Sequence, residues 1–212
     1  MQNLRLIIFD LDGTLIDAYA AINSSFNYTL RKLGLKPQKA SVIRAAVGWG
    51  DGNLLKPFVG PKDLDAATMI YRKHHRLSLI KQSKLYPEVR RLLRQFKARG
   101  YKLAVASNRP TEFSLILLKH LRIFNLFNYV LCSDKLKKGK PAPEILNKIV
   151  AKFGFKKSQT LYVGDMIIDA LAGRRAKIRT IIVTTGSSSL AQVRKERPFK
   201  IISEVRKLAQ II

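Results

Sequence analysis

A series of short apolar runs, spaced along the chain, constrains the fold more than any other feature of this sequence. The first is segment 4–10, which reads Leu-Arg-Leu-Ile-Ile-Phe-Asp, and similar runs follow at Lys102–Ser107, Tyr129–Cys132, Thr160–Gly164 and Thr180–Val183. Each run has the length of a strand, and near-continuous apolar character is typical of a strand buried on both faces of a sheet. We therefore expect these runs to form buried strands.

Segments with helical spacing separate these runs from residue 85 onward. In segment 89–96, apolar residues fall at positions i, i+3, i+4 and i+7, and Gly100 stands where a C-terminal cap is expected. Alternation of strand and helix predicts a parallel sheet with helices on both faces. The expected fold class is therefore α/β, with a doubly wound, Rossmann-like parallel sheet.

Residues 17–84 interrupt this alternation. They contain helical patterns near 18–33 and 64–80, with no convincing strand between them. We expect a core formed by residues 1–16 and 85–212, with residues 17–84 inserted after the first strand as a helical cap domain. Such an insert would lie over the carboxyl ends of the strands, where doubly wound sheets bind ligands.

The length and the composition limit the class of protein. A chain of 212 residues suffices for one α/β domain with a smaller insertion, and its longest apolar runs are too short to cross a bilayer. The first five residues lead directly into an apolar strand, which leaves no room for a cleavable signal. The single cysteine, Cys132, excludes an internal disulfide and a cysteine-rich zinc site. We expect a cytoplasmic monomer or homodimer with no membrane partner.

The charge of the chain is unusual. Forty lysines and arginines against fourteen acidic residues give a formal net charge of +26, which favours phosphate-rich partners. The basic residues are scattered over several segments, as a generally basic solvated surface would also show. A nucleic-acid-binding protein is therefore an alternative class. It is less favoured, because no recognised nucleic-acid-binding motif and no basic stretch interleaved with aromatic residues is found.

Polar side chains follow several of the expected strands. Asp10 and Asp12 end the first strand and precede Gly13 and Thr14. Two carboxylates one residue apart, followed by a glycine that frees the backbone, suit a site that holds a hard cation and also attacks a substrate. An aspartate after a strand also often caps the next helix, so this cluster by itself is a weak signal.

Three further clusters strengthen that signal. Ser107 and Asn108 end a second strand, Lys140 follows a third, and Asp165 ends a fourth, with Asp169 four residues later. The spacing of the last two brings both carboxylates to the same side as a helix begins. Because the carboxyl ends of parallel strands meet at one edge of the sheet, we expect all of these side chains to converge there.

The four clusters resemble the four sequence motifs of the haloacid dehalogenase-like superfamily, and the resemblance extends over essentially the whole chain. It is closest to the phosphoglycolate phosphatase-like branch, which has near equivalents of segments 107–110, 140–144 and 161–165. The resemblance implies a phosphatase that hydrolyses a small phosphorylated metabolite. Because the dehalogenase branch lacks the second aspartate of the first motif, Asp12 favours phosphate chemistry over carbon–halogen cleavage.

The resemblance also implies roles for individual residues. Asp10 is expected to be the nucleophile that forms an aspartyl-phosphate, and Asp12 the acid and base. Ser107 and Lys140 are expected to hold the phosphoryl oxygens. Four more residues are expected to contact the substrate or its phosphate: Gly13, Thr14, Asn108 and Arg109.

A Mg²⁺ cofactor is implied in the same way. Its expected ligands are Asp10, the backbone carbonyl of Asp12, and Asp165, with Asp169 in support. The physical reason for a cation is that a carboxylate attacking a phosphate dianion meets strong repulsion. Met166 departs from the branch, which commonly has a small hydroxyl or amide residue there; the consequence is either looser metal binding or simple packing.

The motifs leave some alternatives open. A β-phosphoglucomutase-type phosphomutase, a pyrophosphatase or a nucleotidase would show the same four motifs. In the cap, Trp49 is interpreted either as lining the substrate entrance or as packing, and Arg44 and Lys56 as candidates for binding a distal anionic group. His74 and His75 are expected to be solvated, and His120 to pack.

Overall fold

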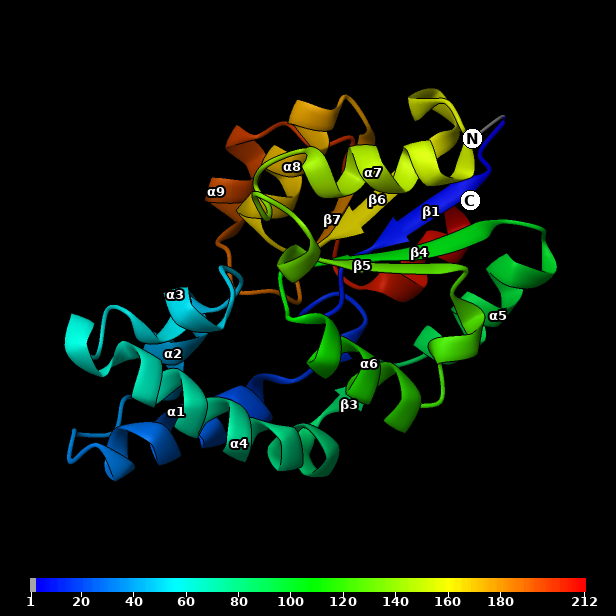
Figure 1. Ribbon diagram of the computed structural model, residues 1–212. Helices are drawn as coiled ribbons and strands as arrows, with labels where there is room; N and C mark the ends of the chain where they lie inside the picture. The colour runs from blue at the N-terminus through cyan, green and yellow to red at the C-terminus, as the bar shows by residue number, and fades with distance from the viewer. Residues whose placement is uncertain (1–2) are drawn as a thin grey trace.

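The computed structural model describes residues 3–212 and places six parallel strands in one sheet, in the order β5-β4-β1-β6-β7-β8 (Figure 1). The strands span β1 Leu6–Phe9, β4 Lys102–Ser107, β5 Tyr129–Cys132, β6 Thr160–Gly164, β7 Arg179–Val183 and β8 Lys200–Ile202. The α/β fold class expected from the sequence is confirmed. β1 lies in the middle of the sheet, paired with β4 on one side and β6 on the other.

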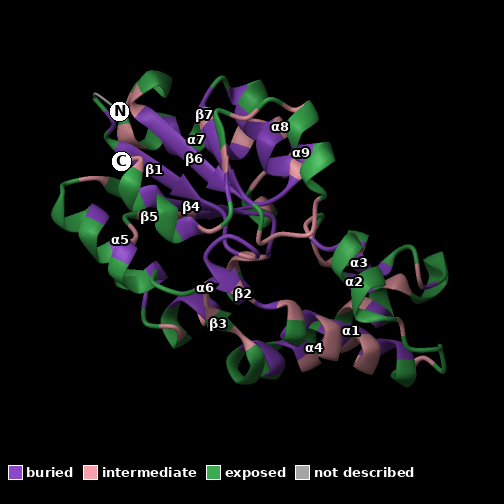
Figure 2. Cartoon of the chain, turned by 180° about the vertical axis from the view of Figure 1, so that it is seen from behind, coloured by how far each residue is buried: buried purple, intermediate pink, exposed green. Residues whose placement is uncertain are grey.

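Helices cover both faces of the sheet. On one face lie α5 Val89–Ala98 and α6 Thr111–His120, and on the other α7 Glu144–Phe153, α8 Ile167–Ala176 and α9 Leu190–Lys195 (Figure 1). Successive side chains of β1 point to opposite faces. Ile7 and Phe9 pack into the larger hydrophobic cluster with α5 and α6, whereas Leu6 and Ile8 pack with α7 and α8. Both faces of β1 are therefore buried, as its continuous apolar sequence requires (Figure 2).

A helical layer formed by residues between β1 and α5 stands over the carboxyl ends of the strands (Figure 1). Its helices are α1 Tyr19–Lys32, α2 Ala40–Ala46, α3 Asp51–Leu55 and α4 Leu64–Gln82. The long helices α1 and α4 pack against each other, and α4 also packs against α6 of the core. The division into core and cap proposed from the sequence stays a prediction.

A short antiparallel pair joins the helical layer to the core. β2 Ile16–Asp17 precedes α1, and β3 Lys84–Leu85 follows α4, with Ile16 opposite Leu85 and Asp17 opposite Lys84. Neither β2 nor β3 was expected from the sequence, because two residues are too few to show a period. β8 was also missed, since it is a three-residue edge strand. Among residues 3–212, no helix combines the length and the apolar character needed to cross a bilayer.

Candidate active site

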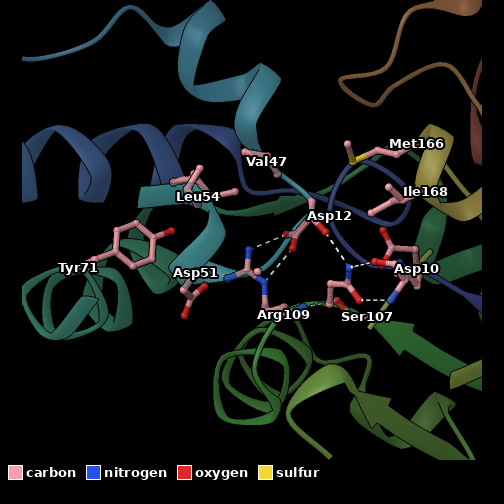
Figure 3. Close-up of a pocket in the computed structure, with 15 residues that line it drawn as sticks. Asp10, Asp12, Val47, Asp51, Leu54, Tyr71, Ser107, Arg109, Met166 and Ile168 are labelled. Atoms are coloured by element: carbon pink, nitrogen blue, oxygen red, sulfur yellow. Dashed lines mark hydrogen bonds and ion pairs between the residues drawn. The ribbon is translucent and has the colours of Figure 1, made fainter. Parts of the chain in front are cut away.

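The candidate active site is a pocket between the carboxyl ends of β1 and β4, the loop after β6, and the helical layer (Figure 3). Its polar side is lined by Asp10, Asp12, Ser107, Asn108, Arg109 and Lys140 from the core, and by Asp51 and Tyr71 from the helical layer. Its apolar side is lined by Ile22, Val47, Leu54, Met166 and Ile168. The free volume is about 50 Å³. A pocket of this size and polarity suits a small, charged molecule.

Three buried carboxylates meet beside this pocket. Asp10, Asp165 and Asp169 each offer an oxygen, and these atoms lie within 4.8 Å of one another. Asp165 Oδ1 accepts a hydrogen bond from Thr14 Oγ1 at 2.9 Å, whereas Asp165 Oδ2 is buried with no hydrogen-bond partner among residues 3–212. Such an unpartnered anionic oxygen is costly unless a cation neutralises it.

The backbone around Asp165 is shaped to leave space near that oxygen. A Cβ atom at Gly13 or at Gly186 would collide with the Asp165 carboxylate, and Gly13 has φ = +80°, which favours glycine. Asp169 is used differently, because its Oδ2 accepts hydrogen bonds from the backbone N–H groups of Asp165 and Met166. The oxygen-only donor set and the orphaned oxygen of Asp165 fit a hard divalent cation.

Lys140 lies among these acids. Its Nζ is 2.8 Å from Asp10 Oδ1 and 2.7 Å from Asp169 Oδ1, and Tyr162 donates its hydroxyl to the same Asp169 oxygen at 2.6 Å. Burial raises the pKa of Asp10 to about 6, with Lys140 lowering it and Asp169 raising it further. Burial opposes the charged ammonium of Lys140, yet the carboxylates of Asp10 and Asp169 hold its pKa above the usual value. Lys140 therefore offsets the charge of the crowded carboxylates.

The β4 end supplies one hydroxyl that lines the pocket and one structural amide. Ser107 lines the pocket, and its Oγ accepts a hydrogen bond from the backbone N–H of Arg109 at 3.1 Å. Asn108 Nδ2 donates to the carbonyls of Gly48 and Lys140, both at 2.9 Å, and its Oδ1 accepts from the backbone N–H of Lys140 at 2.8 Å. Asn108 thus ties the Lys140 loop and the helical layer to β4, and its amide is already used. A direct contact between Asn108 and phosphate stays a prediction.

Arg109 connects Asp12, in the loop after β1, to α4 of the helical layer, and Figure 3 shows its pairing with Asp12. Its Nε and Nη2 atoms each lie 2.8 Å from a different carboxylate oxygen of Asp12, and its Nη1 lies 2.9 Å from Nε2 of His75 on α4. Arg109 is itself buried, with 7% of its surface exposed. This cluster was not expected from the sequence, since its members come from three distant segments.

The structure corrects the expectations about two histidines. His75 is fully buried, stacked on Tyr71 and edge-on to Phe113, rather than solvated. The signal was present in the sequence, because His75 lies four residues from the buried Tyr71 and from the buried Leu79, on the same face of α4. His120, expected to pack, is exposed at the end of α6.

Three other candidates from the cap also lie away from the pocket lining. Trp49 is 46% exposed, although its neighbours Gly48 and Gly50 line the pocket. Arg44 stacks on Tyr19 and donates to the carbonyls of Thr185 and Gly186 in the core, and Lys56 is exposed.

Met166, the departure in the fourth motif, packs where the helical layer meets the core. Its side chain is buried and lines the pocket, and a Cβ at Gly48 would collide with its sulfur. The side chain therefore fills space between Gly48 and the site. Its backbone N–H still donates to Asp169 at 2.9 Å, so the loop is held without a polar side chain at this position.

Comparisons with known proteins identify the family of the chain. The model of the haloacid dehalogenase-like hydrolase family matches residues 7–183. The phosphoglycolate phosphatase of Aquifex aeolicus is 33% identical over 183 residues, which cover 86% of each chain. That of Nitrosococcus oceani is 27% identical and covers 100% of this chain and 98% of its own. The crystal structure of a predicted phosphoglycolate phosphatase from Haemophilus somnus superposes with a TM-score of 0.93 at 27% identity, covering 100% of this chain and 99% of that one.

The fold and the site define a hydrolase in which acidic side chains meet at the carboxyl edge of a parallel sheet. The chain belongs to the haloacid dehalogenase-like hydrolase family. Within that family it is a phosphoric monoester hydrolase that acts on a small phosphate ester.

Proposed function

We propose that this chain hydrolyses 2-phosphoglycolate in a Mg²⁺-dependent reaction that passes through an aspartyl-phosphate on Asp10. The observation that carries the proposal is the pairing of the Asp10 carboxylate with Lys140 beside the unpartnered oxygen of Asp165. The names of the relatives support the substrate, since several are phosphoglycolate phosphatases. The small pocket supports it as well, because phosphoglycolate has a short, charged alcohol portion.

The residues of this chain divide the work as follows. Asp10 attacks phosphorus through one carboxylate oxygen, forming a bond to phosphorus as the bond to the leaving oxygen breaks. Asp12 gives the leaving oxygen a proton and then takes one from the water that cleaves the acyl-phosphate. Ser107 and Lys140 bind the phosphoryl oxygens, with Lys140 also holding Asp10 in place.

Asp10, the backbone carbonyl of Asp12, and Asp165 would hold the Mg²⁺. When bound, the ion neutralises charge between the attacking carboxylate and the phosphate oxygens. Asp169 holds the loop that carries Asp165, because its Oδ2 accepts hydrogen bonds from the backbone N–H groups of Asp165 and Met166. Thr14 fixes the rotation of the Asp165 carboxylate through its hydrogen bond to Oδ1.

A substrate panel tests this proposal. The purified protein is assayed for phosphate release from 2-phosphoglycolate, ethyl phosphate, p-nitrophenyl phosphate, β-glucose 1-phosphate and pyrophosphate, with Mg²⁺ and with EDTA. We expect the highest kcat/KM on 2-phosphoglycolate, loss of activity in EDTA, and recovery with Mg²⁺ in preference to Ca²⁺, whose looser coordination misplaces the carboxylate. A preference for a sugar phosphate that needs a trace of the bisphosphate would instead indicate a mutase. Full activity without metal would contradict the cofactor.

A further inference from the structure

We propose that Arg109 binds a second negative charge on the substrate and that this binding releases Asp12 to act as the acid and base. The inference rests on the proposed function and deepens it, because it names the substrate group whose binding frees Asp12 for catalysis. In this arrangement Arg109 recognises the carboxylate of the alcohol portion, and the phosphoryl group is left to Ser107 and Lys140.

Both oxygens of Asp12 are occupied in the structure. Arg109 Nε donates to Oδ2 and Nη2 donates to Oδ1, both at 2.8 Å, which is a bidentate pair. While both of its oxygens accept hydrogen bonds from one guanidinium, the Asp12 carboxylate is turned toward Arg109 and only its remaining lone pairs are open to a proton. We infer that Asp12 leaves Arg109 before it serves the reaction.

Arg109 cannot be left without an anion. It is buried, and a buried cation that loses its partner is strongly destabilising. In the proposed exchange the substrate anion supplies the replacement, so that one ion pair of Arg109 is exchanged for another. Asp51 of the helical layer also lines the pocket, and its Oδ2 is paired with Arg72 Nε at 3.1 Å.

His75 holds the guanidinium during this exchange. Ser25 Oγ donates to the carbonyl of Ala21 at 2.9 Å, so it accepts from Nδ1 of His75 at 3.1 Å. Nε2 of His75 then has a free lone pair and accepts from Arg109 Nη1 at 2.9 Å. The hydrogen bond from Nη1 to His75 is the same whether Nε and Nη2 of Arg109 bind Asp12 or a substrate carboxylate. His75 is thus a positioning residue that acts through Arg109.

The first test compares two esters that differ in one group, 2-phosphoglycolate and ethyl phosphate, whose methyl group replaces the carboxylate. For the wild-type protein we expect kcat to be about 10²-fold higher on 2-phosphoglycolate, the lower end of what acid–base catalysis contributes. In Arg109→Gln, kcat on 2-phosphoglycolate should fall and kcat on ethyl phosphate should rise, because Asp12 is no longer held. Equal proportional loss on both esters would overturn the proposal, since Arg109 would then serve the shared phosphoryl group.

The second test needs no turnover and is therefore independent of the proposed reaction. Glycolate binding is measured by calorimetry in the wild-type protein, in Asp12→Asn and in Arg109→Gln. Asp12→Asn removes the competing carboxylate, so glycolate should bind about tenfold more tightly, the equivalent of one modest ion pair. Arg109→Gln should abolish binding. Unchanged or weaker binding to Asp12→Asn would overturn the exchange.

The role of His75 is read from a pair of variants. His75→Phe keeps the aromatic packing but cannot accept a hydrogen bond, whereas His75→Gln restores an acceptor. We expect KM for 2-phosphoglycolate to rise in His75→Phe more than KM for ethyl phosphate, with recovery in His75→Gln. Thermal unfolding shows whether His75→Phe folds. If it does not, the role of His75 is judged from the KM values of His75→Gln, and the exchange itself from the calorimetry of Asp12→Asn. A proportional change on both esters would limit His75 to packing.

Discussion

The ammonium of Lys140 lies 2.8 Å from Oδ1 of Asp10, with both residues buried. The same ammonium is 2.7 Å from Asp169. Removing Lys140 would leave these two buried carboxylates without their cation.

Lys140→Met should therefore reduce stability as well as activity. We expect the metal-free variant to lose about 3–5 kcal/mol of unfolding free energy, the usual cost of breaking a buried pair from one side. Denaturant unfolding in EDTA measures this. Lys148→Met is the matched control, because Lys148 forms only a surface pair with Glu144 and its loss should cost less than about 1 kcal/mol. Equal effects of the two substitutions would contradict the role of Lys140.

Asp10→Asn tests the nucleophile. The amide preserves the shape of the side chain but cannot attack phosphorus, so turnover should fall by several orders of magnitude. Thermal unfolding should show an intact fold, because the change also removes one of three crowded acids. Asp65→Asn, at an exposed position in the first turn of α4, serves as the control. Near-normal turnover of p-nitrophenyl phosphate by Asp10→Asn would disprove the assignment.

Asp165 should lower the stability of the metal-free protein while providing a ligand for the metal. Burial, followed by the charges of Asp169 and Asp10, raises the pKa of Asp165 well above its usual value. A group with a raised pKa favours the folded state below its unfolded pKa and loses that contribution as the pH rises, so ionised Asp165 destabilises the metal-free protein at neutral pH.

The corresponding variant is Asp165→Asn. We expect it to raise the unfolding temperature in EDTA and to lose the stabilisation by Mg²⁺, which amounts to about 2.7 kcal/mol at a hundredfold excess over Kd. Thermal unfolding with EDTA and with Mg²⁺ measures both effects. A variant that Mg²⁺ stabilises as strongly as the wild type would show that Asp165 is not a ligand.

His75 should make stability depend on pH. Burial, and then the charge of Arg109, holds the pKa of His75 well below its ordinary value of 6.5. Below pH 6.5 the unfolded chain binds a proton on this side chain and the folded chain does not, so stability decreases as the pH falls. The largest slope from one such group is about 1.4 kcal/mol per pH unit. Unfolding between pH 7 and pH 5 should therefore show a shallower slope for His75→Gln than for the wild type.

The net charge of +26 leads to a prediction about nucleic acid. The basic residues are scattered along the chain, so we expect weak binding to a labelled oligonucleotide that disappears near physiological salt, as counterion release requires. Phosphatase turnover should change little over the same salt range, because contacts inside a buried site are poorly screened. Fluorescence anisotropy measures the binding. Sub-micromolar affinity that persists at about 0.2 M salt would make nucleic acid a partner.

Strands and motif residues were predictable where the sequence itself carries the constraint. The boundaries of β4, β5 and β6 were predicted to the residue, because a strand buried on both faces has to be apolar throughout. The parallel topology then brings Asp10, Ser107 and Asp165 to one edge. In contrast, β2 and β3 consist of two residues each and exist only because they pair with each other.

The contacts of Arg109 could not be predicted for a different reason. Its partners, Asp12 and His75, lie 97 and 34 residues away, and no local pattern specifies which cation meets which carboxylate. His75 was misjudged because two adjacent histidines on a basic helix suggest a solvated face. Its spacing from Tyr71 and Leu79 places it on the buried face of α4, but which side chains it meets there depends on the packing of α4 against α1 and α6, which is a tertiary property.

The pairing of β2 with β3 has a consequence beyond this molecule. The chain leaves the core at Asp17 and returns at Lys84, directly opposite. The whole intervening segment therefore connects β2 and β3 as the turn of a hairpin connects its two strands. Because the two ends already meet, the length and shape of what lies between them impose little on the register of β1 and β4. A gene lineage could therefore exchange this segment at two adjacent junctions and acquire a new substrate preference while inheriting the catalytic sheet unchanged.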